Sequence, residues 1–384
     1  MLTPARLLAS APPLDEMTMK DSDKKPNVLP GLAAAALLLA AAALAVGITA
    51  IARSDNDTSA SDATSAMTAS GMSAEAMEHM APVSTRGIGQ PPSDRGNTPL
   101  QGVRRNGALE FTLDARPVWW RIYGKRRLVA WAYNGIVPGP VIRVRNGERV
   151  RVRFTNRLPD ETTIHWHGIG VPNSQDGVPG VTQKAIEPGA AYTYEFTARP
   201  AGDPNGAGTF LYHSHVDEDR QMSVGLYGAF VIDPPRPVTR PVVERTLAFS
   251  EWSADAASGR TRGVMQMEGM LPNFFTINGR SYPDTEPLDV PAGKRVLLRL
   301  INAGQFAHPL HLHGTAFRVV ARDGHPVARA LQELRDTITL ESGERADIAF
   351  TPPRGKWLLH CHIGHHLTND GEGPGGLITV VNAA

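Results

Sequence analysis

The chain has 384 residues, of which 39 are Lys or Arg and 38 are Asp or Glu, so its formal net charge at pH 7 is only +1. This length allows two or three ordinary domains, and the balanced charge argues against an electrostatic binder of nucleic acid. The single cysteine cannot form an internal disulfide. The folded part must therefore depend on its cores, and the thiol is free for metal binding or chemistry.

The first predicted element is an apolar segment near the amino end. Residues 29–52 (LPGLAAAALLLAAAALAVGITAIA) follow several lysines and are uncharged over about the length that spans a bilayer. The segment is either a membrane anchor or an export signal, because the residues 50–52 resemble a cleavage site. We favour an anchor. The positive charge before it predicts residues 1–28 in the cytoplasm and the rest of the chain outside it.

Residues 53–97 form a predicted linker. They are rich in Ser, Thr, Ala, Asp and Gly with few large apolar side chains, which predicts a disordered tether. The tether contains loosely spaced soft ligands: Met67, Met72, Met77, His79 and Met80. Thioether and imidazole groups suit Cu(I). The tether is therefore either a copper-capturing segment or a low-complexity linker that happens to contain methionine.

The remainder of the chain predicts an all-β body built from two copies of one unit. Its apolar runs are short, β-branched and separated by Gly and Pro turns. Residues 147, 156 and 165 (Gly, Asn, His) recur 146 positions later as the same residue types. The repeat predicts two β-sandwiches of Greek-key type, over residues 98–236 and 237–384.

Four His-x-His pairs lie within this body, two in each copy. In a strand, side chains alternate between faces, so each pair directs both imidazoles to one side, where they can bind a metal ion. The residue enclosed by the last pair is Cys361. Imidazole and thiolate ligands together favour copper. The pairs are His165/His167, His213/His215, His311/His313 and His360/His362.

The segments HWHG, YHSH, HPLHLHG and HCHIGHH resemble, in this order, the copper-binding signatures of multicopper oxidases, and the resemblance covers about residues 98–384. It is closest to the two-domain, small laccase-like type with the blue copper in domain 2. It implies tandem cupredoxin-like barrels and four coppers per functional site. It also implies one-electron oxidation of a reductant coupled to four-electron reduction of O2 to water. Phenols, aromatic amines, Mn(II) and Cu(I) all stay open as reductants.

The same resemblance implies which residues hold each copper. His308, Cys361 and His366 would bind the blue copper, with His365 as the rival of His366. The usual axial position falls on Gly371, so we expect an axial site without methionine. The other coppers would form a three-copper cluster. His165 and His311 would bind its single non-blue copper, and the coupled pair would be bound by His167, His213, His215, His313, His360 and His362.

Acidic residues near the pairs are candidates for proton transfer. Asp176 matches the acidic residue that laccases keep near the cluster, where it could relay protons, but an Asx-turn before Gly177 explains it equally well. The acidic residues 217–219 could assist, although a solvated loop is the simpler interpretation. Val171 stands where small laccases often carry a tyrosine.

The resemblance also implies an assembly and leaves rival functions. In two-domain relatives the cluster lies between domain 1 of one subunit and domain 2 of the next, which predicts a homotrimer. A copper nitrite reductase is the main rival, but those enzymes place the blue-copper cysteine in the first domain. A Cu(I) oxidase serving copper resistance, supplied by the tether, is the other. The expected partners are O2 and a small-molecule or metal-ion reductant, with no nucleic acid.

Overall fold

The computed structural model describes residues 80–236, 243–266 and 269–384, all of which belong to one compact unit. The predicted anchor or signal at 29–52 lies outside the described residues, as do Met67, Met72, Met77 and His79. Within the described ranges, no helix combines the length and the apolar character needed to cross a bilayer.

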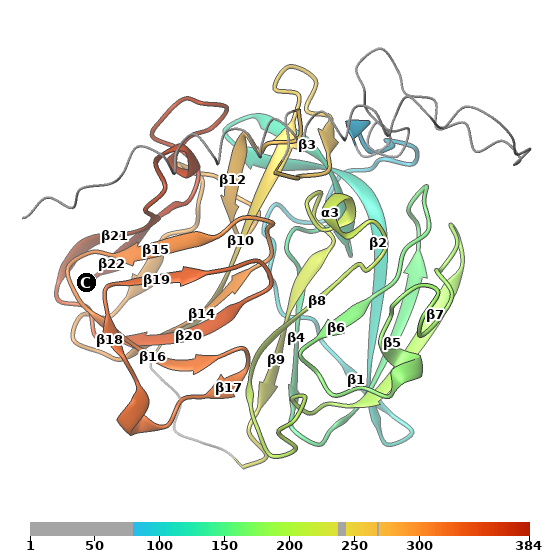
Figure 1. The fold of residues 1–384 in the computed structure, drawn as a ribbon, viewed down its shortest axis with the longest axis horizontal. Helices are drawn as coiled ribbons and strands as arrows, with labels where there is room; N and C mark the ends of the chain where they lie inside the picture. The colour runs from blue at the N-terminus through green and yellow to red at the C-terminus, as the bar shows by residue number, and fades with distance from the viewer. Residues whose placement is uncertain (1–79, 237–242, 267–268) are drawn as a thin grey trace, which may run out of the picture. The chain divides into compact units, whose positions relative to one another are not determined.

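The first half of the described chain forms two β-sheets around one apolar core, drawn in cyan to green in Figure 1. Buried and accessible residues alternate along β2 and β5, so one face of their sheet points into the core. One sheet contains β1 (Val103–Arg105), β2 (Ala108–Tyr123), β3 (Arg126–Tyr133), β5 (Arg149–Asn156) and β7 (Ala191–Thr197). The other contains β4 (Gly139–Arg145), β6 (His165–His167), β8 (Gly208–His213) and β9 (Tyr227–Asp233).

The second half forms another two sheets, drawn in yellow to red in Figure 1, around a second apolar core. One sheet contains β10 (Val243–Ala254), β11 (Thr261–Arg262), β12 (Phe274–Ile277), β14 (Val296–Asn302), β16 (Phe317–Arg322), β17 (His325–Pro326), β18 (Leu334–Arg335) and β20 (Arg345–Phe350). The other contains β13 (Leu288–Val290), β15 (His308–Leu312), β19 (Thr337–Leu340), β21 (Gly355–Cys361) and β22 (Ile378–Ala383).

The two halves repeat one strand arrangement. The order β4-β9-β8-β6 in the first half corresponds to β13-β22-β21-β15 in the second, and both contain one parallel pair, β4 with β9 and β13 with β22. Likewise β2 lies parallel to β5, as β10 lies parallel to β14. The expected all-β fold of two related units is confirmed. The exact boundary at 236/237 stays a prediction, because residues 237–242 are not described.

The helices of the described residues are single turns at the ends of strands and in loops. These helices are η1 (Asn173–Gln175), α3 (Glu218–Gln221), η2 (Arg329–Leu331) and η3 (Gly364–Leu367). Two of them, α3 and η3, directly follow predicted copper-ligand segments and thus help to position these segments.

The described part of the predicted tether, residues 80–97, is packed against the folded body, which corrects the expectation of disorder for this stretch. Val83 is fully buried, and its backbone N–H donates to the carbonyl of Thr261 at 2.8 Å. Gly89 forms a parallel bridge with Val118. Composition missed this segment because a buried valine, backbone hydrogen bonds and ion pairs such as Asp94 with Arg121 hold it in place, not a run of apolar residues.

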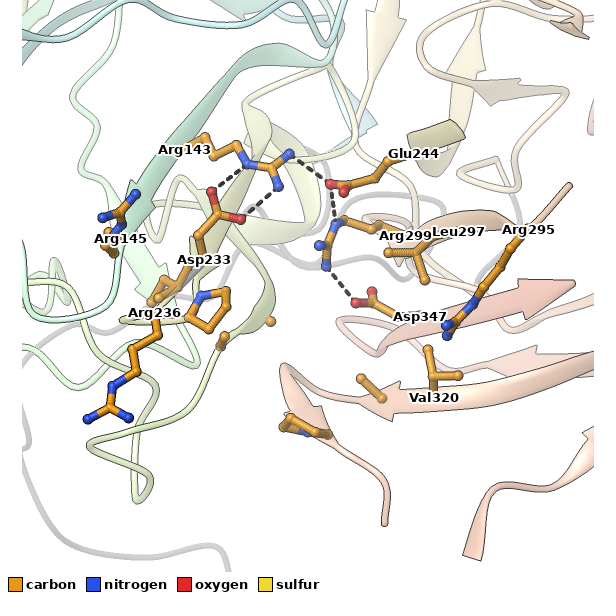
Figure 2. Close-up of a pocket in the computed structure, with 16 residues that line it drawn as sticks. Arg143, Arg145, Asp233, Arg236, Glu244, Arg295, Leu297, Arg299, Val320 and Asp347 are labelled. Carbon is orange, nitrogen blue, oxygen red and sulfur yellow. Dashed lines mark hydrogen bonds and ion pairs between the residues drawn. The ribbon is translucent and has the colours of Figure 1, made fainter. Parts of the chain in front are cut away.

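A chain of alternating charges joins the two halves beside a pocket of about 380 Å³ (Figure 2). Arg143 lies 2.7 Å from Asp233 in its own half and 2.7 Å from Glu244 in the other. Arg299 lies 2.9 Å from Glu244 and 2.6 Å from Asp347. Burial raises the pKa of Glu244, but the two arginines outweigh burial and hold it below its ordinary value. This ionic chain fixes the second half against the first.

Candidate metal centres

One candidate centre is a buried trio of one thiol and two imidazoles. His308 opens β15, Cys361 closes β21 and His366 lies on η3, and their ligand atoms all lie within 4.8 Å of one another. The Nδ1 atoms of the two histidines are 3.1 Å apart, and the Cys361 Sγ is 3.4 Å from Nδ1 of His366. The three residues are at most 1% exposed. A site of this kind suits copper, for which one thiolate and two imidazoles form a trigonal ligand set.

The surroundings of this trio bear on its two open questions. His365, the rival of His366, is exposed and lies outside the trio, with its ring 4.3 Å from that of His366. Gly371, at the expected axial position, is exposed on a loop. Among the described residues, the apolar cluster that contains Cys361 includes no methionine. These observations support His366 as the ligand and an axial position without a thioether.

Burial and charge act in opposite directions on the two histidines of the trio. Burial lowers the pKa of His308, but Cys361 and Glu251 outweigh it and raise this pKa to about 9. Burial, followed by the neighbouring His308, lowers the pKa of His366 to about 3. The asymmetry arises from Cys361 and from Glu251, whose Oε1 lies 2.7 Å from Nε2 of His308. The sequence offered no signal for this residue, which lies 57 positions before the histidine that it contacts.

The four histidines of the first half form what we call the first histidine group: His165, His167, His213 and His215. Strands β6 and β8 pair so that His165 stands directly opposite His213, with ring centroids 5.2 Å apart. The ring of His215 lies 5.4 Å from that of His165. Ligand atoms of His165, His167 and His213 lie within 4.8 Å of one another, as a metal site requires.

The second histidine group, His311, His313, His360 and His362, repeats this arrangement on β15 and β21. His311 stands opposite His360, with ring centroids 5.8 Å apart. The ring of His362 lies 5.6 Å from that of His311, and the Nε2 atoms of His313 and His360 are 3.0 Å apart. The repeat in the sequence is therefore also a repeat in the geometry of its imidazoles.

Backbone carbonyls orient equivalent imidazoles in the two groups. Nδ1 of His165 contacts the carbonyl of Asp176 at 2.8 Å, and Nδ1 of His311 contacts that of Asp336 at 3.0 Å. Nδ1 of His213 contacts the carbonyl of the next residue at 2.8 Å, and Nδ1 of His360 does the same at 2.7 Å. Since Nδ1 must carry the proton to donate to a carbonyl, Nε2 is left free as the metal-binding atom.

The two groups differ in burial and do not meet within one chain. Among the described residues, every ring contact between these histidines stays inside its own group. His213 is buried, whereas His313 and His362 are exposed. Burial, with Arg345 next, lowers the pKa of His167 to about 4. A neutral imidazole is the form that binds metal, so this ligand is ready at neutral pH.

Residues of the second half cover part of the first group. A pocket of about 510 Å³ is lined by His165 and His167 from the first half, and by Asp323, His325 and Arg345 from the second. Gly343 also approaches closely, since a methyl group on it would lie 3.1 Å from Cε1 of His167. The sequence did not predict this lining, because it depends on how the two halves pack.

Two acidic side chains lie close to imidazoles of the first group. The Asp176 carboxylate is 3.4 Å from Nδ1 of His165, although the shorter contact of this nitrogen is to the backbone carbonyl. Glu218 on α3 lies 3.5 Å from Nδ1 of His213 and 4.0 Å from Nε2 of His215. Both acids could orient imidazoles or move protons.

Comparison with family models gives two matches, each described as multicopper oxidase. One matches residues 115–237 and the other residues 257–371. The first match contains His165, His167, His213 and His215. The second match contains every proposed copper ligand of the second half of the chain. The matches therefore cover both histidine groups and the buried trio.

Solved and curated relatives give the same result. The crystal structure of a blue copper oxidase from Nitrosomonas europaea is 34% identical, with a TM-score of 0.65 over 71% of this chain and 85% of that chain. Laccase-2 of Cryptococcus neoformans var. grubii is 31% identical over 61% of this chain and 42% of its own length. Copper resistance protein A of Pseudomonas syringae pv. tomato is 40% identical over 36% of this chain and 21% of its own length. The chain thus spans less than half the length of these curated relatives.

Proposed function

Because the chain belongs to the multicopper oxidase family, we propose that it is a laccase-like enzyme that oxidises a reductant by single electrons and reduces O2 to water. Bound copper would supply the one-electron redox chemistry. Four coppers are proposed per functional site, one in the buried trio and three between histidine groups. The two matched segments and the two-unit cupredoxin-like fold support this proposal.

The position of Cys361 is the observation that carries the proposal. Its thiol belongs to the buried trio, while the residues on either side of it, His360 and His362, belong to the second histidine group. Only the backbone and side chains of three consecutive residues then separate the two kinds of centre. Such a short covalent connection is suited to electron transfer from the site that accepts electrons to the site that uses them.

The ligand assignment follows the family pattern. His308, Cys361 and His366 would hold the blue copper, and one imidazole of each histidine group, from His165 and His311, would hold the single non-blue copper. The coupled pair would be held by His167, His213, His215, His313, His360 and His362. Asp176 is proposed to deliver protons or to orient water near His165, which its 3.4 Å contact with that ring supports.

Replacing the thiol tests the function directly. Copper-loaded C361S should lack the intense blue absorption and should lose O2 consumption with a phenol as reductant, while the fold stays intact by circular dichroism. Serine is a poor ligand for soft copper, so electrons should have no entry site. A C361S variant that still consumes O2 at the wild-type rate would exclude the proposed function.

A homotrimer is proposed as the working assembly. Within one chain the two histidine groups make no ring contact among the described residues, and each group provides only half of the expected cluster. A ring of three chains would pair the first group of one chain with the second group of the next. Sedimentation of the copper-loaded protein should give three chains per particle, and an active monomer would contradict this assembly.

Cu(I) is the second candidate reductant, favoured by the similarity to the Pseudomonas copper resistance protein. Near the packed segment 80–97, a methyl group on Gly269 would lie 2.7 Å from Cε of Met80, and Met270 is the next residue along the chain. Thioethers suit Cu(I). Removing residues 53–79 should lower cuprous oxidation and leave phenol oxidation unchanged, and equal loss of both activities would argue against a role in delivery.

An extracytoplasmic location is proposed for the enzyme. The uncharged segment 29–52 and the lysines before it support anchoring or export. Fractionation of the native cells, with detection of the folded chain in membrane and soluble extracytoplasmic fractions, distinguishes an anchor from a cleaved signal.

A further inference from the structure

A fourth functional group, which the family assignment does not include, lies beside the buried trio. Glu251 lies on β10, and its side chain is 1% exposed. Its Oε1 atom is 2.7 Å from Nε2 of His308, which is itself fully buried. The oxygen lies off the direction of the ring N–H, so the contact is electrostatic and is not an aligned hydrogen bond. The carboxylate therefore stands directly behind a predicted copper ligand.

The protein holds this carboxylate in place from the other side. Backbone N–H groups of Gln305 and Phe306 donate to its two oxygens at 2.9 and 3.2 Å. Gly304 leaves the space that the carboxylate fills, because a methyl group there would lie 1.9 Å from Oε2. The loop before His308 is thus shaped around Glu251, which fixes the distance between the carboxylate and the imidazole.

No arginine or lysine of the described residues forms an ion pair with Glu251. Among the described residues, its one ion-pair contact is with His308. A buried carboxylate is costly unless donors or an opposite charge compensate it. In the other buried ion pairs of this chain an arginine has that role, as Arg299 does for Asp347. Here the protonated ring of His308 can balance the carboxylate, and once a metal binds the neutral ring through Nδ1, the metal would supply the positive charge instead.

The two imidazoles of the trio are consequently unequal. Behind His308 stands a carboxylate, whereas His366 stacks on Phe275 with ring centroids 4.4 Å apart. A carboxylate behind a ligating histidine makes that histidine a stronger electron donor. The side chains of Phe275 and Glu251 come from adjacent strands, at directly paired positions of β12 and β10.

We propose that Glu251 is a positioning and charge-compensating residue of the blue-copper site that stabilises its oxidised state. This inference rests on the proposed function, in which His308, Cys361 and His366 bind copper. With one thiolate and two neutral imidazoles, Cu(II) leaves the site with one positive charge and Cu(I) leaves it neutral. A fixed negative charge beside His308 favours the former. Bound copper would accept the transferred electron, and Glu251 would neither form nor break a bond in that step.

The test compares the copper-loaded wild-type chain with E251Q. The glutamine keeps the size and one acceptor oxygen but removes the charge. At a fixed applied potential, the Cu(I) to Cu(II) ratio of the blue site should rise by about 10- to 100-fold in E251Q, with the blue absorption retained. E110Q is the matched control, because Glu110 is also buried but is balanced by Arg151 and Arg153, each at 3.1 Å. Its ratio should stay at the wild-type value.

An E251Q ratio equal to that of the wild type, in protein that is still blue, overturns the inference. A wild-type chain that binds no blue copper contradicts the proposed function instead, so the two failures are distinguishable. If E251Q does not fold, pulsed EPR on the wild type replaces it. The remote nitrogens of the two copper-bound histidines should then give different quadrupole couplings, because a carboxylate lies beside one of them. Equal couplings would contradict the proposal.

Discussion

The first and second histidine groups have the same internal geometry but opposite surroundings. In both, two antiparallel strands place one histidine opposite another, and backbone carbonyls fix equivalent Nδ1 atoms. The first group is partly buried and covered by residues of the second half of its own chain, such as Arg345. The second group leaves His313 and His362 exposed.

The two units thus hold four histidines each in one arrangement, while the packing of the halves gives the two groups different surroundings. The first group has its cover within the chain. The second group has none among the described residues and presents imidazoles to solvent, which is the state expected of a surface that completes a site on another molecule. The predictions below would each break or sharpen that contrast.

The largest expected effect is the loss of activity when either group loses its leading histidine. H165A and H311A should each lower O2 consumption by at least about 100-fold, since removing a direct ligand costs no less than removing an outer-shell partner. Copper content per chain and O2 uptake measure the effect. H325A is the control, because His325 lines the pocket beside the first group but belongs to neither. If only one of the two variants lost activity, the groups would not share one cluster.

A smaller effect is expected when the ionic chain between the halves is broken. E244Q removes the carboxylate shared by Arg143 and Arg299 and should lower the free energy of unfolding by roughly 1–3 kcal/mol. Hydrogen exchange should rise at His165–His167, which the second half covers, and stay unchanged at His311–Leu312. Increased exchange in both segments would mean that the cover does not distinguish the groups. E195Q, at an accessible ion pair, is the control.

The effect of E244Q on the free energy of unfolding should depend on pH in a defined direction. The pKa of Glu244 lies below its ordinary value of 4.5 in the folded chain, so the folded state favours its ionised form. Its contribution to stability is complete above the unfolded-state pKa and is lost as the pH falls through the lower folded-state pKa. The difference in unfolding free energy between wild type and E244Q should therefore shrink on acidification below about pH 4.5. A difference that grows there would contradict this assignment.

The last comparison concerns the stability of the metal-free chain, and its exposed member should show the smallest effect of all. H213A removes a buried ring that contacts the Ser214 carbonyl, and should destabilise the fold by roughly 1–3 kcal/mol. H362A, at an exposed ring, should change stability by less than about 0.5 kcal/mol. Denaturant unfolding of both variants without copper measures the difference. Equal destabilisation would remove the contrast in burial on which the comparison of the two groups rests.

Much of the fold and of the metal ligands could be predicted from the sequence because the signals are local. One His-x-His pair lies wholly on a strand, β6, where alternation sends both imidazoles to one face. In the other three pairs only the first histidine lies on the strand, and the second follows its end. The 146-residue repeat predicted the matching strand order. His366 was separated from His365 by family spacing, and the structure puts the latter on the surface.

The parts that could not be predicted depend on contacts between distant segments. Glu251 contacts His308 because this residue of β10 lies against the loop before β15, and no pattern in the sequence connects the two residues. The cover of the first group by Arg345 arises from the packing of one half on the other. Residues 80–97 were assigned to a tether because their composition is polar, yet Val83 is buried.

The pairing of the two groups between chains is the central claim, and mixed oligomers test it most directly. Chains carrying H165A and H167A would be co-expressed with chains carrying H311A and H313A, under different affinity tags, and particles with both tags would be isolated. Each variant alone should be inactive. In a ring of three, every mixed particle contains one junction with two intact groups, so it should recover about one third of the wild-type O2 consumption. Mixed particles without activity would show that the cluster is not shared between neighbouring chains.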